Sequence, residues 1–449
     1  MTMNESTPQW PRPEHRTPEQ IAQDSAAVAA QIRVLTPGHR FARTPATTSV
    51  ARILQRQPAV ADRRRFVDYP TDGASGPVLA AGDELVIEAD EDQLTALAAT
   101  LQDRYTVERR PGRRTHVLRR RGRATADVRA DLARLRGQRV TANINLVMPL
   151  GYVVKADSYP TLTTGPGGFP AQHIDETIRV AIIDTGRAAA QRHDAWDTGV
   201  VPTGTDPLNV VAPLDRNDWF AGHGTFTAGI VRQIAPTCEV LVYRFTGPDG
   251  LGTDDAAADM FIEAADDAAR DGRRLVINAS FGAPAVDDAT PLAMREAVEY
   301  IAGRYPEVLI VASAGNDGID EPFYPAAFSD LGVKAVGALN ADLSGAAFSN
   351  RGDWVDCSAV GVGVVSTYVP GLLPPEPNIG PDIVFPEDAW AAWSGTSFTA
   401  PQISAAVAQL CAESPALDPR SAFDQLLAGR PTLGGFGAVV HLLRGTPAA

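Results

Sequence analysis

Four short apolar runs, separated by stretches with helical periodicity, constrain the fold of this sequence more than any other feature. The runs are Ile178–Ile183, Val240–Phe245, Leu275–Ile277 and Val308–Ala312. Predominantly apolar runs of this length are typical of strands that are buried on both faces. The helical stretches between them are Thr225–Ile234, Asp254–Arg270 and Pro291–Gly303. This alternation predicts an α/β fold, with an open parallel sheet and helices on both faces.

A different pattern occupies residues 81–155. Strand-like runs at Glu84–Ala89, Tyr105–Arg110, Thr115–Arg120 and Ile144–Met148 alternate with two helical faces, at Leu94–Leu101 and Val128–Leu135. The order β-α-β-β-α-β predicts a small α+β domain of ferredoxin-like topology.

The remaining segments divide the chain further. Residues 1–80 lack sustained periodicity apart from a helix predicted at Pro18–Leu35, so we expect a poorly ordered or partly helical arm. Residues 156–174 are rich in Pro, Gly and Thr, which predicts an exposed and cleavable linker before the α/β domain at 175–449.

Composition excludes some classes of protein. The sequence has no stretch of about 18 uncharged apolar residues, so we expect no membrane-spanning helix. Its first thirty residues lack the pattern of a secretory signal, which predicts a soluble cytoplasmic protein. Cys238, Cys357 and Cys411 lie too far apart for a CxxC metal site, and we expect all three in the core.

The charge is divided unequally along the chain. Residues 1–150 hold 23 basic and 17 acidic residues, and residues 151–449 hold 17 and 37, so net charges of +6 and −20 make up the total of −14. Opposite charges favour attraction between the two parts. The thirteen arginines between Arg104 and Arg139 also fit a nucleic-acid-binding surface, but only Tyr105 supplies an interleaved aromatic ring, so we favour the first interpretation.

Four motifs place reactive side chains at the ends of predicted strands or the starts of predicted helices. IRVAIIDTG ends a strand with Asp184, and VASAGND ends another with Asn316. GHGTFTAG places His223 between two glycines, and WSGTSFTAP places Ser397 at a helix N-terminus, where free N–H groups favour developing negative charge. Each motif alone has a structural explanation as a turn, a packed histidine or a helix cap.

Together, in the order Asp, His, Ser, the motifs resemble those of the subtilisin-like (subtilase, S8 family) serine proteases. The resemblance covers about residues 175–430. It implies that Asp184, His223 and Ser397 form a catalytic triad and that Asn316 is an oxyanion donor. It also implies that two short runs bind substrate, namely Ser280, Phe281 and Gly282, and Ser313, Ala314 and Gly315.

The function implied by the resemblance is the hydrolysis of peptide bonds in a protein or peptide substrate through an acyl-enzyme. No cofactor is required for this chemistry, and no residue is assigned to a metal. The family's calcium-binding loops are not recognisable, although 37 acidic residues in this region would allow a calcium site. A Pro-rich insertion at Pro370–Pro386 precedes the nucleophile motif.

The small domain resembles, in topology, the propeptide domain of this family. The resemblance implies an intramolecular inhibitor and folding chaperone that packs on helices of the protease and leads its C-terminal end into the active site. We therefore predict self-cleavage of the zymogen between Leu150 and Asp175. Two alternatives stay open: a catalytically silent subtilisin-fold binding module, and a protease effector that is regulated by the basic domain as a sensor.

Overall fold

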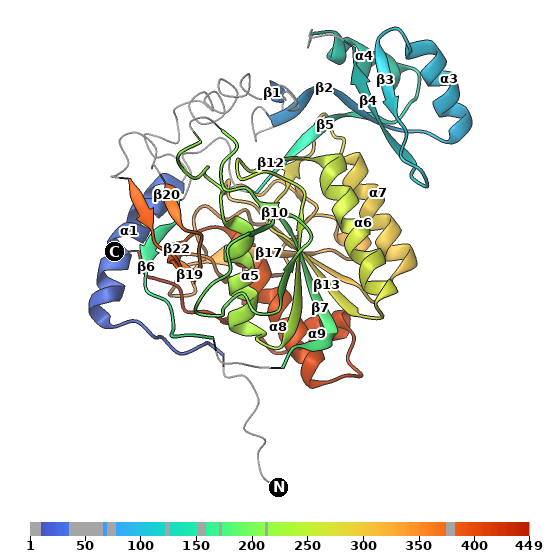
Figure 1. Cartoon of the computed structure of the whole chain (residues 1–449). Helices are drawn as coiled ribbons and strands as arrows, with labels where there is room; N and C mark the ends of the chain where they lie inside the picture. The colour runs from blue at the N-terminus through green and yellow to red at the C-terminus, as the bar shows by residue number, and fades with distance from the viewer. Residues whose placement is uncertain are drawn as a thin grey trace.

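The computed structural model describes residues 10–35, 66–69, 78–121, 126–150, 159–169, 173–211, 214–373 and 382–448. These residues form a large α/β unit and a small α+β unit, which pack against each other (Figure 1). The elements from Thr161 onward form the large unit, and those between Phe66 and Pro149 form the small unit.

The large unit is built on a nine-stranded sheet with the order β23-β24-β18-β17-β15-β13-β7-β11-β9. Its strands are β7 (Asp175–Asp184), β9 (Val200–Pro202), β11 (Cys238–Arg244), β13 (Arg274–Ala279), β15 (Leu309–Ser313), β17 (Lys334–Leu339), β18 (Cys357–Val360), β23 (Thr432–Leu433) and β24 (Gly437–Val439). All neighbours are parallel except β23 and β24. The predicted parallel sheet is thus confirmed.

Helices cover both faces of this sheet. One group is α5 (His223–Ile234), α8 (Ala400–Glu413) and α9 (Pro419–Leu427), and the other is α6 (Asp254–Arg270) and α7 (Leu292–Arg304) (Figure 1). Strand β7 is buried from Ile178 to its end. Its one internal charge, Arg179, is compensated by ion pairs with Glu239 and Asp271, which is why a charged residue is tolerated there.

The small unit has the predicted element order. Its elements are β1 (Phe66–Tyr69), β2 (Val78–Glu88), α3 (Glu91–Leu101), β3 (Tyr105–Glu108), β4 (Thr115–Arg120), α4 (Ala126–Gly137) and β5 (Ala142–Pro149). The four predicted strands pair antiparallel in the order β5-β2-β4-β3. This is the split-βαβ arrangement expected from the sequence.

The small sheet has two additional strands at its edges. Strand β1 pairs with β2, although it lies in the range that the sequence assigned to an arm. On the other side, β12 (Leu251–Thr253) of the large unit pairs with β5. A single hydrogen-bonded sheet therefore crosses from the small unit into the large one.

The N-terminal helix α1 (Pro18–Leu35) has the predicted bounds. It packs on a small sheet of β19 (Val364–Thr367), β22 (Trp390–Trp393) and β6 (Thr161–Thr163). Strand β6 lies inside the range predicted to be an exposed linker. Its residues instead pair with β22 and Thr161 is buried, although Leu162 is exposed as predicted.

The remaining described elements are short. They are β8 (Arg187–Ala188), β10 (Thr205–Asp206), β14 (Ala283–Pro284), β16 (Phe323–Tyr324), β20 (Gly371–Leu373), β21 (Ile383–Phe385), and the 3₁₀ turns η2 (Ser329–Leu331) and η3 (Thr396–Phe398). Cys238, Cys357 and Cys411 are all buried and unbridged, as expected. Within the described parts of the chain, no helix has the length and apolar character needed to cross a membrane.

Candidate active site

Asp184 and His223 are joined by a buried hydrogen bond. Asp184 is the last residue of β7 and His223 is the first of α5. The Nδ1 atom of His223 lies 2.9 and 2.8 Å from the two carboxylate oxygens of Asp184, and both side chains are at most 1% exposed. A carboxylate can only accept, so Nδ1 carries the proton and Nε2 is the atom available as a base.

The glycines beside His223 allow this close approach. Gly222 has φ +76°, in the left-handed region that favours glycine, and it ends the preceding turn where α5 begins. A Cβ atom on Gly224 would lie 2.2 Å from the carbonyl oxygen of Gly186. The GHG motif therefore lets α5 begin directly against the turn that follows Asp184.

Ser397 lies in the 3₁₀ turn η3, immediately before α8. Its hydroxyl is 2.8 Å from the carbonyl oxygen of Leu150 and 3.1 Å from that of Ser280, and its single hydrogen is directed to these oxygens, with Leu150 the nearer acceptor. Among the described residues, no hydrogen bond joins Ser397 to His223. The two are neighbours through Phe398, whose ring centroid is 5.3 Å from that of His223.

Asn316 is held in a defined orientation beside Ser397. Thr396 donates its backbone N–H and its hydroxyl to the Oδ1 atom of Asn316, at 2.8 and 2.9 Å. Because Oδ1 is the acceptor in both bonds, the amide nitrogen is the end of this side chain that can donate to another group.

A pocket opens beside Ser397. Four of the six predicted substrate-binding residues line it: Phe281, Gly282, Ser313 and Gly315. The other two, Ser280 and Ala314, are fully buried and do not line it. Ser280 instead donates its hydroxyl to the carbonyl oxygen of Ser397 at 2.8 Å, so it supports the turn that carries this serine.

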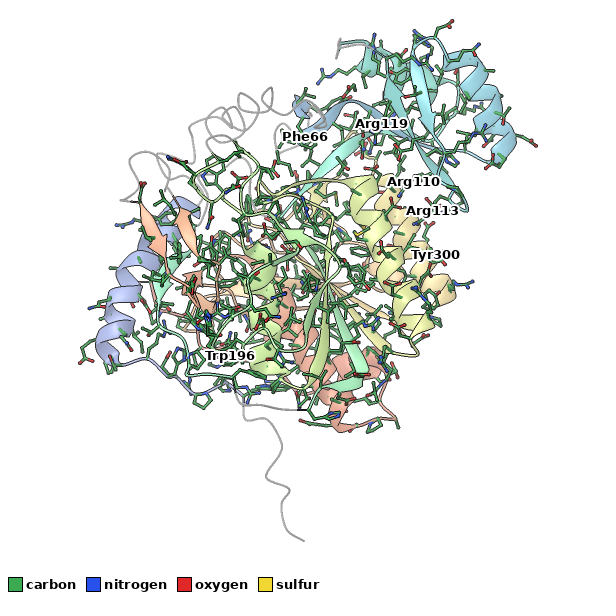
Figure 2. All side chains as sticks on the ribbon, in the orientation of Figure 1. Phe66, Arg110, Arg113, Arg119, Trp196 and Tyr300 are labelled. Atoms are coloured by element: carbon green, nitrogen blue, oxygen red, sulfur yellow. The ribbon has the colours of Figure 1, made fainter. Side chains whose placement is uncertain are left out.

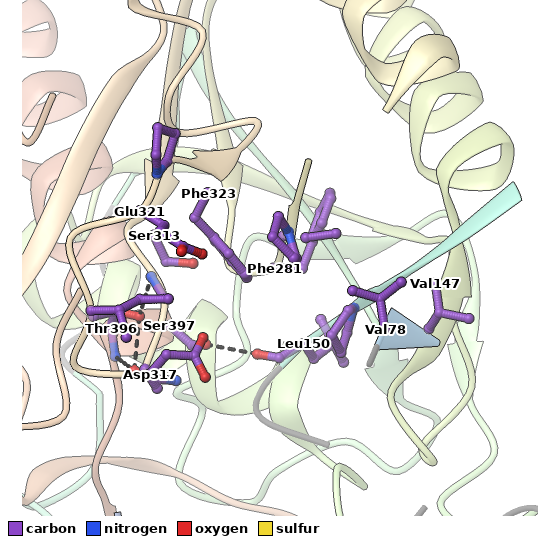
Figure 3. A pocket seen from close by; sticks show the side chains of 18 of the residues that line it. Val78, Val147, Leu150, Phe281, Ser313, Asp317, Glu321, Phe323, Thr396 and Ser397 are labelled. Atoms are coloured by element: carbon purple, nitrogen blue, oxygen red, sulfur yellow. Dashed lines mark hydrogen bonds between the residues drawn. The ribbon is translucent and has the colours of Figure 1, made fainter. Parts of the chain in front are cut away.

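Phe323 narrows this pocket, and the sequence analysis did not single it out. Its ring lies between the two predicted walls: a Cβ atom on Gly282 would be 2.4 Å from it and one on Gly315 would be 3.2 Å from it. Asp317 and Glu321 also line the pocket, so acidic groups accompany its apolar wall (Figure 3). A side chain at position 282 would collide with the ring, a constraint that a single sequence does not reveal.

The end of the small unit lies in this site. Strand β5 pairs with β12 on one side, and Gly282 donates to the carbonyl oxygen of Pro149 at 3.3 Å on the other. The next residue, Leu150, is buried, lines the pocket and accepts the hydrogen bond from Ser397 (Figure 3). A segment of the chain therefore crosses the candidate active site in the manner of an added strand.

A second buried carboxylate supports the site, and sequence reasoning missed it. Asp206 accepts hydrogen bonds from the hydroxyl of Thr185 and from the N–H of Gly222, both at 2.8 Å. Burial, with a smaller effect from the charge of Asp184, raises the pKa of Asp206 to about 6. Asp206 thus connects Thr185, which follows Asp184, with Gly222, which precedes His223.

Charged contacts join the two units. Arg110 and Arg113 of the small unit (labelled in Figure 2) pair with Asp259 on α6. Arg114 pairs with Glu299 on α7. Glu296, also on α7, accepts hydrogen bonds from the backbone N–H groups of Arg114 and Thr115.

Among the described arginines between positions 104 and 139, at least eight form ion pairs. They are Arg104, Arg109, Arg110, Arg113, Arg114, Arg119, Arg134 and Arg136. This pairing uses much of the positive charge that suggested a nucleic-acid-binding surface, so it weakens that hypothesis.

No metal centre is assigned. In the described part of the chain, no group of three or more His, Cys, Asp or Glu side chains is placed to hold a metal ion. The buried carboxylates of Asp184 and Asp206 are both occupied by hydrogen bonds from protein groups, so neither fits a calcium ligand.

Comparison with known proteins identifies the family. Residues 175–430, more than half of the chain, match the subtilase family (peptidase S8), and the chain belongs to this family of serine proteases. This confirms the resemblance deduced from the sequence motifs.

Individual relatives agree with this assignment. The chain is 33% identical over 245 residues to the thermophilic serine proteinase of Bacillus sp. (strain AK1), and the match covers 52% of this chain and 52% of that relative. It therefore spans about half of the relative's length. It is 28% identical over 270 residues to subtilisin DY of Bacillus licheniformis, covering 57% of this chain and 85% of the relative.

A solved structure shares the fold. The structure of fervidolysin from Fervidobacterium pennivorans, described as a keratinolytic enzyme related to subtilisin, matches 84% of this chain and 62% of its own. The TM-score is 0.57 and the sequence identity 19%, so this likeness concerns the fold alone.

Proposed function

We propose that this protein is a serine endopeptidase that uses Ser397, His223 and Asp184 as its catalytic triad. The observation that carries the proposal is the buried bond between Asp184 and Nδ1 of His223. The ring of Phe398, the residue after Ser397, contacts the His223 ring, and the Ser397 hydroxyl faces a peptide carbonyl. Membership of the subtilase family supports it.

In the proposed reaction, Ser397 rotates toward His223 and attacks the substrate carbonyl carbon while Nε2 takes its proton. Asp184 keeps Nδ1 protonated and stabilises the imidazolium. The amide nitrogen of Asn316 and the backbone N–H of Ser397 donate to the oxyanion; one such donor lowers the barrier by roughly 3–4 kcal/mol. His223 then protonates the leaving amine, and water releases the acyl group from Ser397 by the same steps in reverse.

We further propose that the small unit is an intramolecular inhibitor and folding chaperone. The hydrogen bond between Ser397 and Leu150 supports this role, because it directs the hydroxyl hydrogen away from His223 and fills the substrate position with the protein's own chain. The interface arginines supply the attraction that the charge distribution predicts.

Self-cleavage follows from the same contact. The carbonyl of Leu150 is held beside Ser397, so the proposed cut lies within two residues of Leu150, at the N-terminal end of the range predicted from the sequence. The effective concentration of such a bond exceeds that of any free peptide. Cleavage and location in the cell remain predictions.

Labelling with a serine-reactive fluorophosphonate tests the proposed nucleophile. The wild-type protein, once cut at the linker, should be labelled, and Ser397→Ala should not. Ser421→Ala, which removes an exposed serine of α9, is the matched control and should be labelled like the wild type. Failure to label the wild type in any form would favour the catalytically silent binding module.

A further inference from the structure

Residues 10–35, which we call the strap, precede the small unit in the sequence but contact the large one. The strap consists of an extended stretch and helix α1. In Figure 1, α1 lies beside β6 and β22, on the side of the large unit away from the small unit. The chain therefore attaches to the large unit once before the small unit and again after it.

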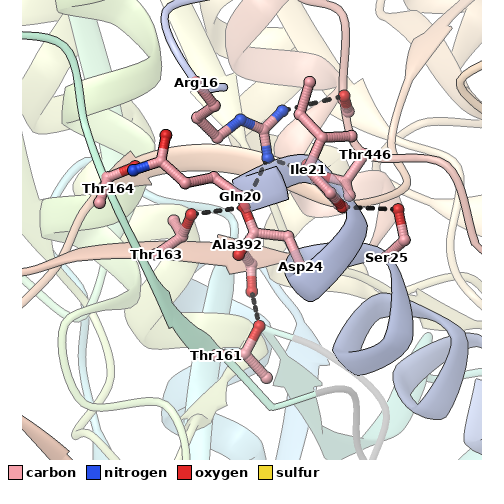
Figure 4. Close-up of polar contacts among 12 residues, drawn as sticks. Arg16, Gln20, Ile21, Asp24, Ser25, Thr161, Thr163, Thr164, Ala392 and Thr446 are labelled. Atoms are coloured by element: carbon pink, nitrogen blue, oxygen red, sulfur yellow. Dashed lines mark hydrogen bonds and ion pairs between the residues drawn. The ribbon is translucent and has the colours of Figure 1, made fainter. Parts of the chain in front are cut away.

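The first contact is made by a buried charge cluster. Arg16, which is 7% exposed, pairs with Asp24 of α1 at 2.9 Å and donates to the hydroxyl of Thr446 at 2.7 Å (Figure 4). Asp24 in turn accepts from the hydroxyl of Thr163 on β6 at 2.6 Å. Removing the strap would leave Thr446 and Thr163 without these partners inside the large unit.

Backbone contacts extend this attachment. The N–H of Arg12 donates to the carbonyl oxygen of Leu442 at 2.9 Å, and Arg444 donates to the carbonyl oxygen of Arg12 at 3.2 Å. The strap thus also holds the C-terminal segment.

The second contact lies near the end of α1. Gln31 is fully buried and donates to the carbonyl oxygen of Ala392 at 3.0 Å, while its own oxygen accepts from the hydroxyl of Ser394 at 2.8 Å. Ser394 is three residues before Ser397. Val28, also fully buried, joins an apolar cluster with Trp390 and other residues of the large unit.

We propose that the strap remains bound to the large unit after the linker is cut and tethers the small unit to it. The binding of the strap does not depend on the proposed self-cleavage; only the two-chain form of the protein rests on that proposed function. A cut near Leu150 would then yield a two-chain protein, in which the small unit is held by its own interface and by the covalent connection to the strap.

This arrangement has a kinetic consequence. A small unit that leaves the active site stays tethered, and its rebinding is intramolecular, at an effective concentration that free small unit in solution does not reach. Activity would then appear slowly after the cut, and a second cut between the strap and the small unit would accelerate it.

The test uses full-length Ser397→Ala, so it does not depend on the protein's own activity. One recognition sequence for an unrelated specific protease is inserted after Pro45, and a second type is inserted after Gly151. Cutting both sites gives three fragments. In size-exclusion chromatography at a protein concentration of about 1 µM, the fragment 1–45 should elute together with the fragment that begins at residue 152. Elution of fragment 1–45 on its own would overturn the proposal.

Release of the small unit provides the second readout. Its dissociation half-life should be at least about tenfold shorter when both sites are cut than when only the second is cut. Equal half-lives would contradict the tether.

Matched variants test the docking contact itself. Gln31→Ala removes the buried contact with Ala392 and Ser394, and should shorten the half-life of the bound strap about tenfold or more. Gln23→Ala, at an exposed position on the same helix, should leave it unchanged. Equal effects of the two substitutions would contradict docking through this face of α1.

Discussion

Ser397 donates its hydroxyl hydrogen to the carbonyl oxygen of Leu150, 247 positions earlier in the chain, across 2.8 Å. The same hydroxyl would have to turn toward His223 for catalysis. The contact therefore supports both parts of the proposal. The end of β5 would block the candidate active site while it is in place, and the peptide bond near Leu150 would be the first that Ser397 cleaves.

The fit of Leu150 should control this first cleavage. Leu150 is buried in a pocket that Asp317 and Glu321 also line. In Leu150→Asp, a buried carboxylate would face these acidic side chains, and self-cleavage should slow about tenfold or more. Leu162→Asp, at a 47% exposed position on β6, is the control and should cleave normally. Equal rates, measured by gel densitometry, would exclude Leu150 from recognition.

Phe323 should limit the size of the substrate residue that enters the pocket. Its ring fills the space between Gly282 and Gly315, so Phe323→Ala should enlarge the pocket. We expect kcat/KM for peptides with an aromatic residue at the cleavage site to rise about tenfold or more relative to alanine peptides, since space for even one methylene in an apolar pocket is worth ~1–3 kcal/mol. An unchanged ratio would show that Phe323 does not contact the substrate.

The base should be indispensable. His223→Ala should reduce turnover on the order of 10⁴-fold while leaving the fold intact. Stopped-assay kinetics on the linker-cut protein measure this loss, and circular dichroism checks the fold. Near-normal turnover would mean that the triad has been misassigned.

Glu296 should contribute strongly to the interface between the two units. Its carboxylate accepts two backbone N–H groups of β4 and the turn before it. Glu296→Ala would leave both donors unpaired, which costs about 1–3 kcal/mol of binding free energy between the units. The small unit of the linker-cut protein should therefore dissociate roughly 5- to 150-fold faster. Glu307→Ala, just after α7 and exposed, should have no effect. Surface plasmon resonance can compare the two; similar rates would contradict a role for Glu296.

Asp254 should make the stability of the large unit depend on pH. Burial raises the pKa of Asp254 to about 7, so the folded state binds its proton more tightly than the unfolded state, where the value is 3.8. Stability from this proton is complete below about pH 4 and is lost as pH rises toward 7.

The comparison of wild type with Asp254→Asn isolates this effect. Asp254 accepts from the N–H groups of Ala293 and Met294, and the amide loses one of these bonds at every pH. Relative to the variant, in a Ser397→Ala background, the wild type should lose stability between pH 4 and pH 7 in urea unfolding. Parallel curves would contradict the raised pKa.

Much of this fold was predictable because local pattern and tertiary environment agree. The apolar sequence of strand β7 and the amphipathic sequence of helix α6 are sufficient to predict these elements. The bounds of α1 and α6 agree with the prediction. The motifs likewise pointed to Asp184 and His223, which end β7 and begin α5, and to Asn316 and Ser397, which lie shortly after β15 and shortly before α8.

The features that were missed depend on partners far along the chain. Strand β6 is polar and becomes a strand only by pairing with β22, more than 200 residues later. The roles of Asp206 and Phe323 arise from close contacts with Gly222 and Gly282, which no local pattern indicates. The docking of the strap is equally invisible, because Gln31 reads as an ordinary helical glutamine.

Intact-mass spectrometry over time tests the central claim most directly. Purified wild type should split into two fragments that meet within two residues of Leu150, while Ser397→Ala should keep its full mass under the same conditions. If the wild type stays uncut for days, or if Ser397→Ala is cut at the same bond, then Ser397 does not cleave the segment that occupies its site.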